Sequence, residues 1–590
     1  MPGASKHQKG KPQGLQRFTT NVSNSTQKSL VMLRSQDLSA DGRRVREKLV
    51  PVQPPPPLKK PRILAALAEH RVFDSDYGMD FGLGFGSFAA GGQYGVPALP
   101  REALEDKESK RKKRADASGK PMKDWIELTP KFLAELMFHE GRGGLAAQVE
   151  CSECHKQNDA LSRCRDCFSR RLLCAGCMVA EHQTRPFDRV EKWNGSFFER
   201  TTLQKLGLII QLGHPIGEKC SQPQPSRTGF VVVDLEGIQD VSLQFCECRS
   251  VEAAGERWQQ LMRARLYPAT VAEPHTAFTF RTLSHFHHLT TQGKVSLYDF
   301  YYTLEKRTDA LGISDPKDRY EAFIRVMRQW RYLRMLQRSG IGNQPSQRIE
   351  DIRDGELAIR CPACPRPGVN MPENFTALSK HIDACFRLKR RQISNEKKDP
   401  GLFTGLAYFV SQKDYQPWLK SVGEQKETST CSGLAAVDQA NTKYSRGYAT
   451  TGSMLCLCAR HEIVEPTGMV DLRKGEKFAL SDYAVGSSQR HSDERLFRVL
   501  CYDIACQYHK RFFERMACLP TVARIGLHKD RWKFAVPKLH IQGHERRCQE
   551  YFALHFILGA GQTDGEGIEQ HWANLGPIGT STREMGPGHR

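Results

Sequence analysis

The chain has 590 residues, of which 26% are charged and 39% hydrophobic, and its formal net charge is +21 at pH 7. This length allows several domains with at least one large core, and the basic excess favours phosphate-rich partners, with anionic membrane surfaces second. No run of about 18 apolar residues is present, which argues against a membrane span, and the start MPGASKHQKG lacks the apolar core of a secretory signal. Nineteen cysteines without such a signal indicate a reducing compartment, where thiols bind metal more often than they pair.

Residues 1–124 are predicted to form a disordered, basic N-terminal region. The proline run PVQPPPPLKKPR (51–62) and the glycine-rich segment FGLGFGSFAAGGQYG (81–95) bury too little apolar surface to offset the entropy of ordering. The basic run KRKKR (110–114) has the composition of a nuclear import signal, and equally that of a solvated linker. The first interpretation predicts a nuclear protein.

A cysteine cluster domain is expected over residues 125–250, after a short helix in PKFLAELMFHEGRG (130–143) that ends at glycine. Three CxxC knuckles and a histidine follow: Cys151 and Cys154, Cys164 and Cys167, Cys174 and Cys177, and His182. A knuckle can place two thiolates on one zinc ion at about 2.3 Å, and two tetrahedral ions need eight ligands. The nearest candidate for the eighth is Asp188. By analogy with interleaved two-zinc modules, the first and third knuckles are expected to share one ion, and the second to join His182 and Asp188.

A third zinc site is a hypothesis for the next segment, around the strand pair FVVVDLEGIQDVSLQFCEC. Its candidate ligands are His214, Cys220, Cys246 and Cys248. Their spacing is loose, so burial in a packed core explains them equally well. All of these sites have closed ligand sets, which is typical of structural rather than catalytic zinc. Structural zinc can contribute on the order of 10 kcal/mol to folding.

Residues 251–350 are predicted to form a helical linker region. In RYEAFIRVMRQWRYLRMLQRSG, the residues Phe323, Met327 and Trp330 keep helical spacing. Four arginines cover the remaining surface: Arg325, Arg328, Arg331 and Arg334. A solvated face is the default interpretation of these arginines, and contact with a DNA backbone is the alternative.

Residues 351–590 alternate short apolar runs with helical patterns, which indicates a mixed α/β domain. Metal-dependent phosphoryl chemistry uses carboxylates from separate segments to hold two ions about 3.5–4 Å apart. Asp503 in RVLCYDIACQYHK ends an apolar run, and Asp383 in HIDACFRLKRR precedes basic residues. Asp234 in VVVDLEG also follows a strand pattern, but its position favours a hairpin-turn aspartate.

An acidic cluster lies in GQTDGEGIEQHWANLG (561–576), where Asp564, Glu566 and Glu569 fall within six residues. One interpretation is a helix start with Asp564 as the N-cap. Upstream, VPKLHIQGHERRCQEYF contains His540, His544 and Cys548, which would share one face of a helix. These three residues could hold a metal, position groups beside an active site, or be a satisfied helix face.

Taken together, these motifs resemble the Kyakuja–Dileera–Zisupton (KDZ) transposases of fungi and other eukaryotes, from about Trp125 to the last residue. The cysteine segment, continued through FVVVDLEGIQDVSLQFCEC, resembles the CxC-type cluster of this family. The catalytic resemblance is carried by GELAIRCPACPRPGVNMPENF, HIDACFRLKRR, DPGLFTGLAYFV, LCARH, DLRKGEKFALSDYA, YDIACQYHKRFFERM, FAVPKLHIQGHERRCQ and GQTDGEGIEQHWANLGPIGTSTREMGPGHR.

The resemblance implies an RNase H-like α/β catalytic domain with a D-D-E site that binds magnesium or manganese. Asp383 would be the first acid, Asp503 the second and Glu566 the third, with Glu569 as the competitor for that role. The implied chemistry is hydrolytic DNA cleavage followed by transesterification into a target. The implied partners are transposon ends and target DNA, chromatin proteins at the cysteine cluster, and further copies of the chain.

The chain departs from the family at three places. The family usually has histidine where Asp188 stands, and a more apolar strand where Lys380 and His381 precede Asp383. Its members also continue past EMGPG, so residues 351–590 are expected to be incomplete at the C-terminus. Two alternatives therefore stand beside an active transposase: an inactive, zinc-dependent DNA- or chromatin-binding protein derived from one, and a protein-interaction module that resembles a B-box.

Overall fold

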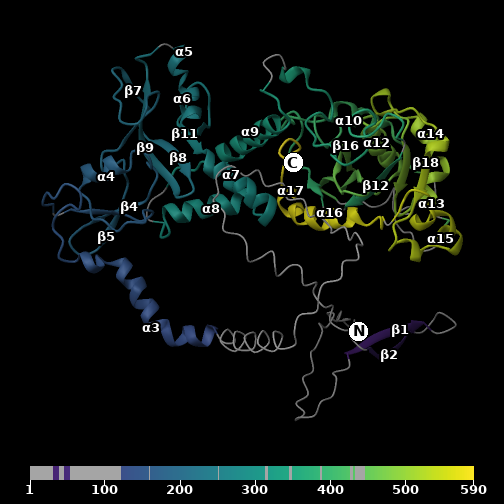
Figure 1. Cartoon of the computed structure of the whole chain (residues 1–590), viewed down its shortest axis with the longest axis horizontal. Coiled ribbons are helices and arrows are strands. Elements are labelled where there is room, and N and C mark those ends of the chain that lie inside the picture. The colour runs from purple at the N-terminus through teal and green to yellow at the C-terminus, as the bar shows by residue number, and fades with distance from the viewer. Residues whose placement is uncertain are drawn as a thin grey trace, which may run out of the picture. The chain divides into compact units, whose positions relative to one another are not determined.

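The computed structural model of the chain (Figure 1) describes residues 31–38, 45–52, 121–158, 160–249, 251–312, 316–343, 348–375, 377–385, 388–425, 430–431, 446–561 and 563–590. The chain divides into two compact units, Met1–Gly119 and Lys120–Arg590. No helix within these described ranges is both long enough and apolar enough to span a bilayer.

The first unit contains an antiparallel pair of strands, β1 (Val31–Leu38) and β2 (Val45–Val52). Disorder was predicted for this part of the chain, and the pair differs from that prediction. VREKLVPV shows no regular alternation of apolar and polar residues, so the pattern contains no clear strand signal. The glycine-rich segment and KRKKR lie outside the described residues.

The second unit begins with α3 (Pro121–Glu140), which ends before Gly141 as the sequence predicted but starts nine residues earlier than expected. A small module with a three-stranded sheet follows, in the order β3-β4-β5. Its elements are β3 (Ser162–Cys164), α4 (Ala175–Glu181), β4 (Val190–Trp193) and β5 (Phe198–Thr201). Its core is small and includes the buried side chains of Leu161, Leu173, Met178 and Val190.

A six-stranded sheet comes next, with the order β10-β11-β8-β9-β6 and with β7 paired to β9. Its strands are β6 (Ile209–Gln211), β7 (Pro223–Pro225), β8 (Phe230–Asp234), β9 (Gly237–Cys246), β10 (Leu266–Pro268) and β11 (Thr276–Thr279). The helices of this region are α5 (Val251–Ala254), α6 (Arg257–Arg263), α7 (Phe280–His288), α8 (Leu297–Thr308) and α9 (Tyr320–Arg338). Four strands of this sheet precede residue 250 and two follow it, although the sequence analysis placed a domain boundary there.

The arginines of α9 are not a purely solvated face. Arg328 forms an ion pair with Asp399 at 2.6 Å, and Arg331 lies over the Phe286 ring, where burial lowers the pKa of its guanidinium. Arg325 reaches the carbonyl of Ala269. On its buried side, α9 packs against a core of phenylalanines in which the Phe323 ring stacks on that of Phe278.

The C-terminal domain is built on a five-stranded mixed sheet in the order β16-β15-β12-β17-β18. The strands are β12 (Ala377–Cys385), β15 (Gly452–Cys458), β16 (Val464–Leu472), β17 (Phe497–Cys501) and β18 (Trp532–Ala535). β12, β17 and β18 are mutually parallel, and β15 runs antiparallel to both β12 and β16. β13 (Arg390–Arg391) pairs with β14 (Tyr448–Thr450) in a separate ladder.

Helix α12 (Phe478–Gln489) packs on this sheet and is buried along nearly its whole surface, which explains why its sequence shows no apolar stripe. Among the described residues, the remaining α-helices of this domain are α10 (Gln412–Ser421), α13 (Ala505–Tyr508), α14 (Phe512–Ala517), α15 (Arg546–Phe552), α16 (Gly567–Leu575) and α17 (Gly579–Arg583). Buried aromatic rings fill the core between α10, α12 and α13, including Tyr415, Tyr483 and Tyr508. Leu500 of β17 lies in the same core, which fixes the position of that strand.

Candidate metal centres and acidic site

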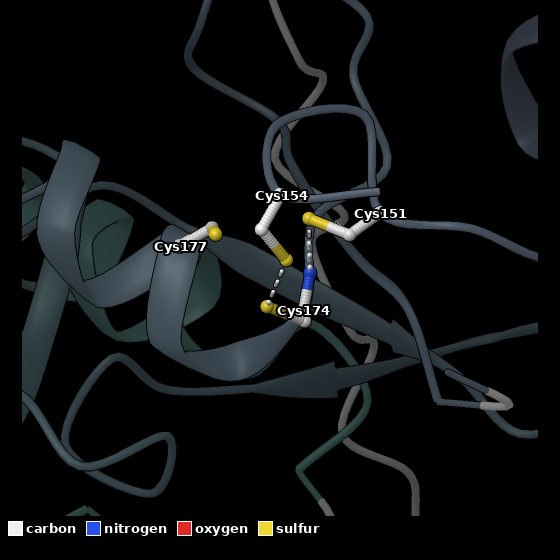
Figure 2. A group of neighbouring side chains, drawn as sticks. All are labelled: Cys151, Cys154, Cys174 and Cys177. Carbon is white, nitrogen blue, oxygen red and sulfur yellow. Dashed lines mark hydrogen bonds between the residues drawn. The ribbon is translucent and has the colours of Figure 1, made fainter. Parts of the chain in front are cut away.

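The first and third knuckles come together as the sequence predicted (Figure 2). The ligand atoms of Cys151, Cys154, Cys174 and Cys177 all lie within 4.8 Å of one another. The Cys154 and Cys174 sulfur atoms are 3.8 Å apart, and the Cys174 backbone N–H donates to the Cys151 sulfur at 3.3 Å. Backbone N–H groups lower the pKa of Cys151 to about 6 against the opposing effect of burial. This environment favours a thiolate, the form that binds zinc.

The second knuckle lies with His182 and Asp188, again with all ligand atoms within 4.8 Å. His182 Nε2 is 3.2 Å from the Cys167 sulfur, while Nδ1 lies 2.9 Å from the carbonyl of Met178. Because a carbonyl only accepts hydrogen bonds, the proton sits on Nδ1 and Nε2 keeps its lone pair for a metal. An Asp188 oxygen is 3.7 Å from both the Cys164 sulfur and His182 Nε2. The donor set fits one tetrahedral zinc ion.

The third predicted set, His214, Cys220, Cys246 and Cys248, also converges within 4.8 Å. His214 Nε2 is 3.2 Å from the sulfur atoms of both Cys246 and Cys248. Its Nδ1 faces the Glu218 carboxylate at 3.5 Å, the kind of outer contact that orients a ligating imidazole. These distances favour a ligand set over simple core packing.

The structure brings together two further groups of the same kind, of whose members the sequence analysis had proposed only His544 and Cys548 as possible metal ligands. One is Cys361, Cys364, Cys458 and His461, and the other is Cys431, Cys506, His544 and Cys548. The CPAC knuckle at Cys361 and Cys364 was a usable signal, and its partners lie at the end of β15 and in the turn that follows. Backbone and thiol hydrogen bonds, led by that from Cys364, lower the pKa of Cys361 to about 3.

The predicted trio in 540–548 does not share one helix face. A 3-10 turn covers Ile541–Gly543, and α15 begins only at Arg546. His544 between them has extended backbone, with ψ 162°, which breaks the helical repeat. His540 and His544 consequently point to different sites, and only His544 and Cys548 lie together.

His540 stands among the acids at the end of the C-terminal sheet. Its Nδ1 is 3.5 Å from an Asp503 oxygen, and its Nε2 is 3.8 Å from Glu566 and 3.9 Å from Glu569. Asp503 follows β17, and Glu566 caps the start of α16. Burial first, and then the charges of Glu569 and Glu566, raise the pKa of Asp503 to about 6 against the opposing effect of His540. A divalent ion bound here would reduce the electrostatic repulsion between these neighbouring carboxylates.

The acidic cluster is also hydrogen-bonded to the chain segment that contains His540. Glu566 accepts a hydrogen bond from the Leu539 backbone N–H at 2.7 Å, and Asp564 accepts one from the Glu566 N–H at 3.1 Å. The N-cap of α16 is therefore Glu566, not Asp564 as one interpretation had it. Gly565 between them has φ +87°, and a Cβ there would lie 3.1 Å from the backbone of Pro537. Only glycine allows this close approach.

Glu566 and Glu569 differ in exposure: the Glu566 side chain is 11% exposed and that of Glu569 is 52% exposed. A further acidic residue near this cluster, Glu462, was missed by the sequence analysis. It directly follows His461, and a Cβ on Gly567 would lie 2.5 Å from its Cγ. Burial, followed by the charge of Asp564, raises its pKa.

Asp383 lies on β12 next to β17. The parallel register pairs His381 with Cys501. Asp383 stands two residues further along β12, and Asp503 stands two residues beyond the end of β17. Neighbouring strands are about 4.8 Å apart, which brings the two backbone positions to the same end of the sheet.

Asp234, the remaining strand-borne acid, is fully buried in the turn from β8 to β9. It accepts hydrogen bonds from Thr279 at 2.6 Å and from Arg281 Nε at 2.7 Å. These contacts identify it as a structural residue, in keeping with the hairpin-turn interpretation.

A cleft of about 1420 Å³ borders the second and third ligand groups. Its lining carries six exposed basic residues: Arg185, Lys219, Arg263, Arg265, Arg281 and Arg334. Asp188 and Glu218 also line it. The balance of charge in the cleft is positive, which suits an anionic ligand.

The fold and these sites define a protein with several candidate zinc groups and a separate acidic centre on a mixed α/β domain. Residues 376–590 match the family model of the Kyakuja-Dileera-Zisupton transposase, and residues 203–312 match the CxC2 like cysteine cluster associated with KDZ transposases. These matches show a KDZ transposase domain preceded by the cysteine cluster that is associated with such domains. The matched cluster covers the third ligand group, and the first two groups precede it. No curated protein and no solved structure matches the chain.

Proposed function

We propose that the chain is a metal-dependent DNA transposase whose RNase H-like domain cleaves and transfers DNA strands with Asp383, Asp503 and Glu566. The observation that carries the proposal is the acidic centre around His540, where carboxylates from two distant segments lie at the end of a mixed sheet. The sheet order supports the fold assignment, because a central β12 has a hairpin on one side and two parallel strands on the other.

The acids have separable tasks in this proposal. Asp383 and Asp503 would hold magnesium or manganese between adjacent strand ends, and Glu566 would complete the set from α16. When bound, such ions activate the attacking oxygen and stabilise the leaving oxygen of a phosphodiester. Glu566 is favoured over Glu569 because it is buried and fixed by the Leu539 N–H. His540 lies within reach of both carboxylate groups and would orient them.

DNA would be held by the protein's positive charge. The net charge of +21 supports contact with a phosphate backbone, and the basic cleft beside the third ligand group is the proposed contact surface. A nuclear location belongs to the same proposal. It is supported by KRKKR (110–114), which lies outside the described residues.

The test is nicking and strand transfer by the purified full chain on terminal-repeat DNA from its own genomic flanks, with Mn²⁺. Asp503→Asn and Glu566→Gln should abolish both reactions, while the exposed Asp530→Asn should leave them unchanged. Salt-sensitive DNA binding without cleavage by the parent chain would refute the proposal and favour the inactive DNA-binding alternative.

A further inference from the structure

A buried group of thiols and an imidazole lies directly beside the acidic centre. It consists of Cys431, Cys506, His544 and Cys548, whose ligand atoms are all within 4.8 Å of one another. The first three residues are buried and Cys548 is partly buried. The four residues come from three segments that are far apart in the chain, so their convergence is a product of the fold.

The distances match those of a tetrahedral zinc site. His544 Nδ1 is 3.4 Å from the Cys506 sulfur and 3.6 Å from the Cys431 sulfur, and the sulfur atoms of Cys431 and Cys548 are 4.0 Å apart. With Zn–S about 2.3 Å and Zn–N about 2.0–2.1 Å, tetrahedral geometry requires about 3.6 Å between sulfur and nitrogen and about 3.8 Å between sulfur atoms. A disulfide would need sulfur atoms about 2.05 Å apart.

Simple core packing explains the group less well. The adjacent core is built from Tyr502, Tyr508 and Ile541, whereas the three sulfur atoms face one another and one imidazole nitrogen. Buried cysteines that act only as small apolar residues have no reason to converge on a histidine from separate segments.

The group is linked to both sides of the acidic centre by short stretches of chain. Cys506 follows Asp503 by three residues, at the start of α13. His544 follows His540 by four residues, across the 3-10 turn Ile541–Gly543. A metal held by Cys506 and His544 would therefore fix the end of β17 against the segment that carries His540.

We propose that Cys431, Cys506, His544 and Cys548 form a structural zinc site that sets the separation of Asp503 and His540. Four protein ligands close the coordination sphere, so the site has no open position for water and is not catalytic. The zinc assignment stands independently of the proposed function, whereas the positioning role depends on it.

The first experiment measures the zinc content of the purified full chain by inductively coupled plasma mass spectrometry. Cys548→Ser should lose one zinc ion per chain relative to the parent, and the exposed Cys518→Ser should lose none. His544→Cys, which keeps a four-ligand set, should retain the zinc. A Cys548→Ser protein that is folded and holds as much zinc as the parent would overturn the assignment.

A second experiment requires no substitution in the site. Alkylation of the parent chain, mapped by peptide mass spectrometry, should modify Cys431, Cys506 and Cys548 only after a chelator has removed zinc. Cys518 should react equally with and without the chelator. If chelation leaves the reactivity of the three cysteines unchanged, the proposal is wrong.

The positioning role has its own readout, the Mn²⁺ concentration at half-maximal nicking. Removal of an outer partner typically weakens a metal site roughly 10–100-fold, so Cys548→Ser should need that much more Mn²⁺, and Cys548→His should restore the parent value. An unchanged Mn²⁺ requirement in a zinc-deficient Cys548→Ser protein would overturn the positioning role alone. If the parent chain does not nick DNA, the proposed function fails while the zinc measurements still decide the site.

Discussion

Replacement of Asp503 by asparagine should stabilise the metal-free protein near neutral pH. Burial and the charges of Glu569 and Glu566 raise the pKa of Asp503 from 3.8 to about 6, with His540 acting against them. The folded protein therefore holds this proton more tightly than the unfolded chain does. The ionised carboxylate is a destabilising feature that His540 relieves in part and a bound cation would relieve further.

The size of the effect follows from the shift. About two pKa units correspond to about 3 kcal/mol between the two protonation states. Because the folded-state pKa is raised, the unfavourable contribution grows as the pH rises from 3.8 and is nearly complete at about one pH unit above the folded-state value. Asparagine carries no charge, so Asp503→Asn should gain about 3 kcal/mol at pH 7.5 and about 2 kcal/mol at pH 5.5.

Urea denaturation of the zinc-loaded full chain, without magnesium or manganese, measures both values. Asp530→Asn, at an exposed position, is the control and should match the parent at both pH values. Added Mn²⁺ should raise the stability of the parent through mass action but not that of Asp503→Asn. The reasoning is refuted if Asp503→Asn is less stable than the parent at pH 7.5, or if both proteins gain equally from Mn²⁺.

Three other predictions test separate parts of the molecule. Glu566→Gln should abolish nicking, because it removes a ligand of the proposed catalytic metal ions. Glu569→Gln should reduce the nicking rate by about 10-fold at most, the lower end of the effect of losing an outer partner of a metal site. The opposite order in a single-turnover assay would assign Glu569 as the third acid. Replacement of Lys219, Arg265 and Arg334 by alanine should weaken the salt dependence of duplex DNA binding. The slope of the logarithm of the binding constant against the logarithm of the salt concentration should fall in magnitude by about 0.9 for each phosphate that is no longer neutralised. Lys413→Ala is the control that should change nothing, and an unchanged slope in the triple variant would show that the cleft does not bind DNA. His182→Ala should release one zinc ion per chain and make residues 151–188 sensitive to limited proteolysis, because structural zinc supplies much of the folding energy of so small a module; full zinc retention would contradict the second ligand group.

Local patterns in the sequence predicted some sites well. Each CxxC knuckle supplies two candidate ligands that are close together in the sequence. The analogy with interleaved two-zinc modules then predicted which knuckles share an ion. Asp503 was recognisable because an apolar strand run ends just before it. By contrast, Cys431 stands alone in the sequence, and its partner Cys506 is 75 residues away, so only the folded chain brings them together.

The prediction that His540, His544 and Cys548 share one helix face is wrong for a definite physical reason. A spacing of four residues predicts a shared face only where the helix is continuous, and the extended backbone at His544 interrupts it. The choice between Glu566 and Glu569 likewise depended on burial and on the hydrogen bond from Leu539, neither of which a sequence pattern contains.

The interruption at His544 gives the two halves of this segment different chemistry. His540 faces carboxylates, which suit hard, oxygen-binding ions, while His544 faces thiols, which suit zinc. The same division occurs after β17, where Asp503 faces the acids and Cys506 faces the thiols. Each of the two segments thus contributes one residue to the acidic centre and one to the thiol group, so a movement of either centre would displace the other. An acidic centre held in this way would tolerate its own charge repulsion before metal binds, because closed thiolate coordination resists the separation of the two segments.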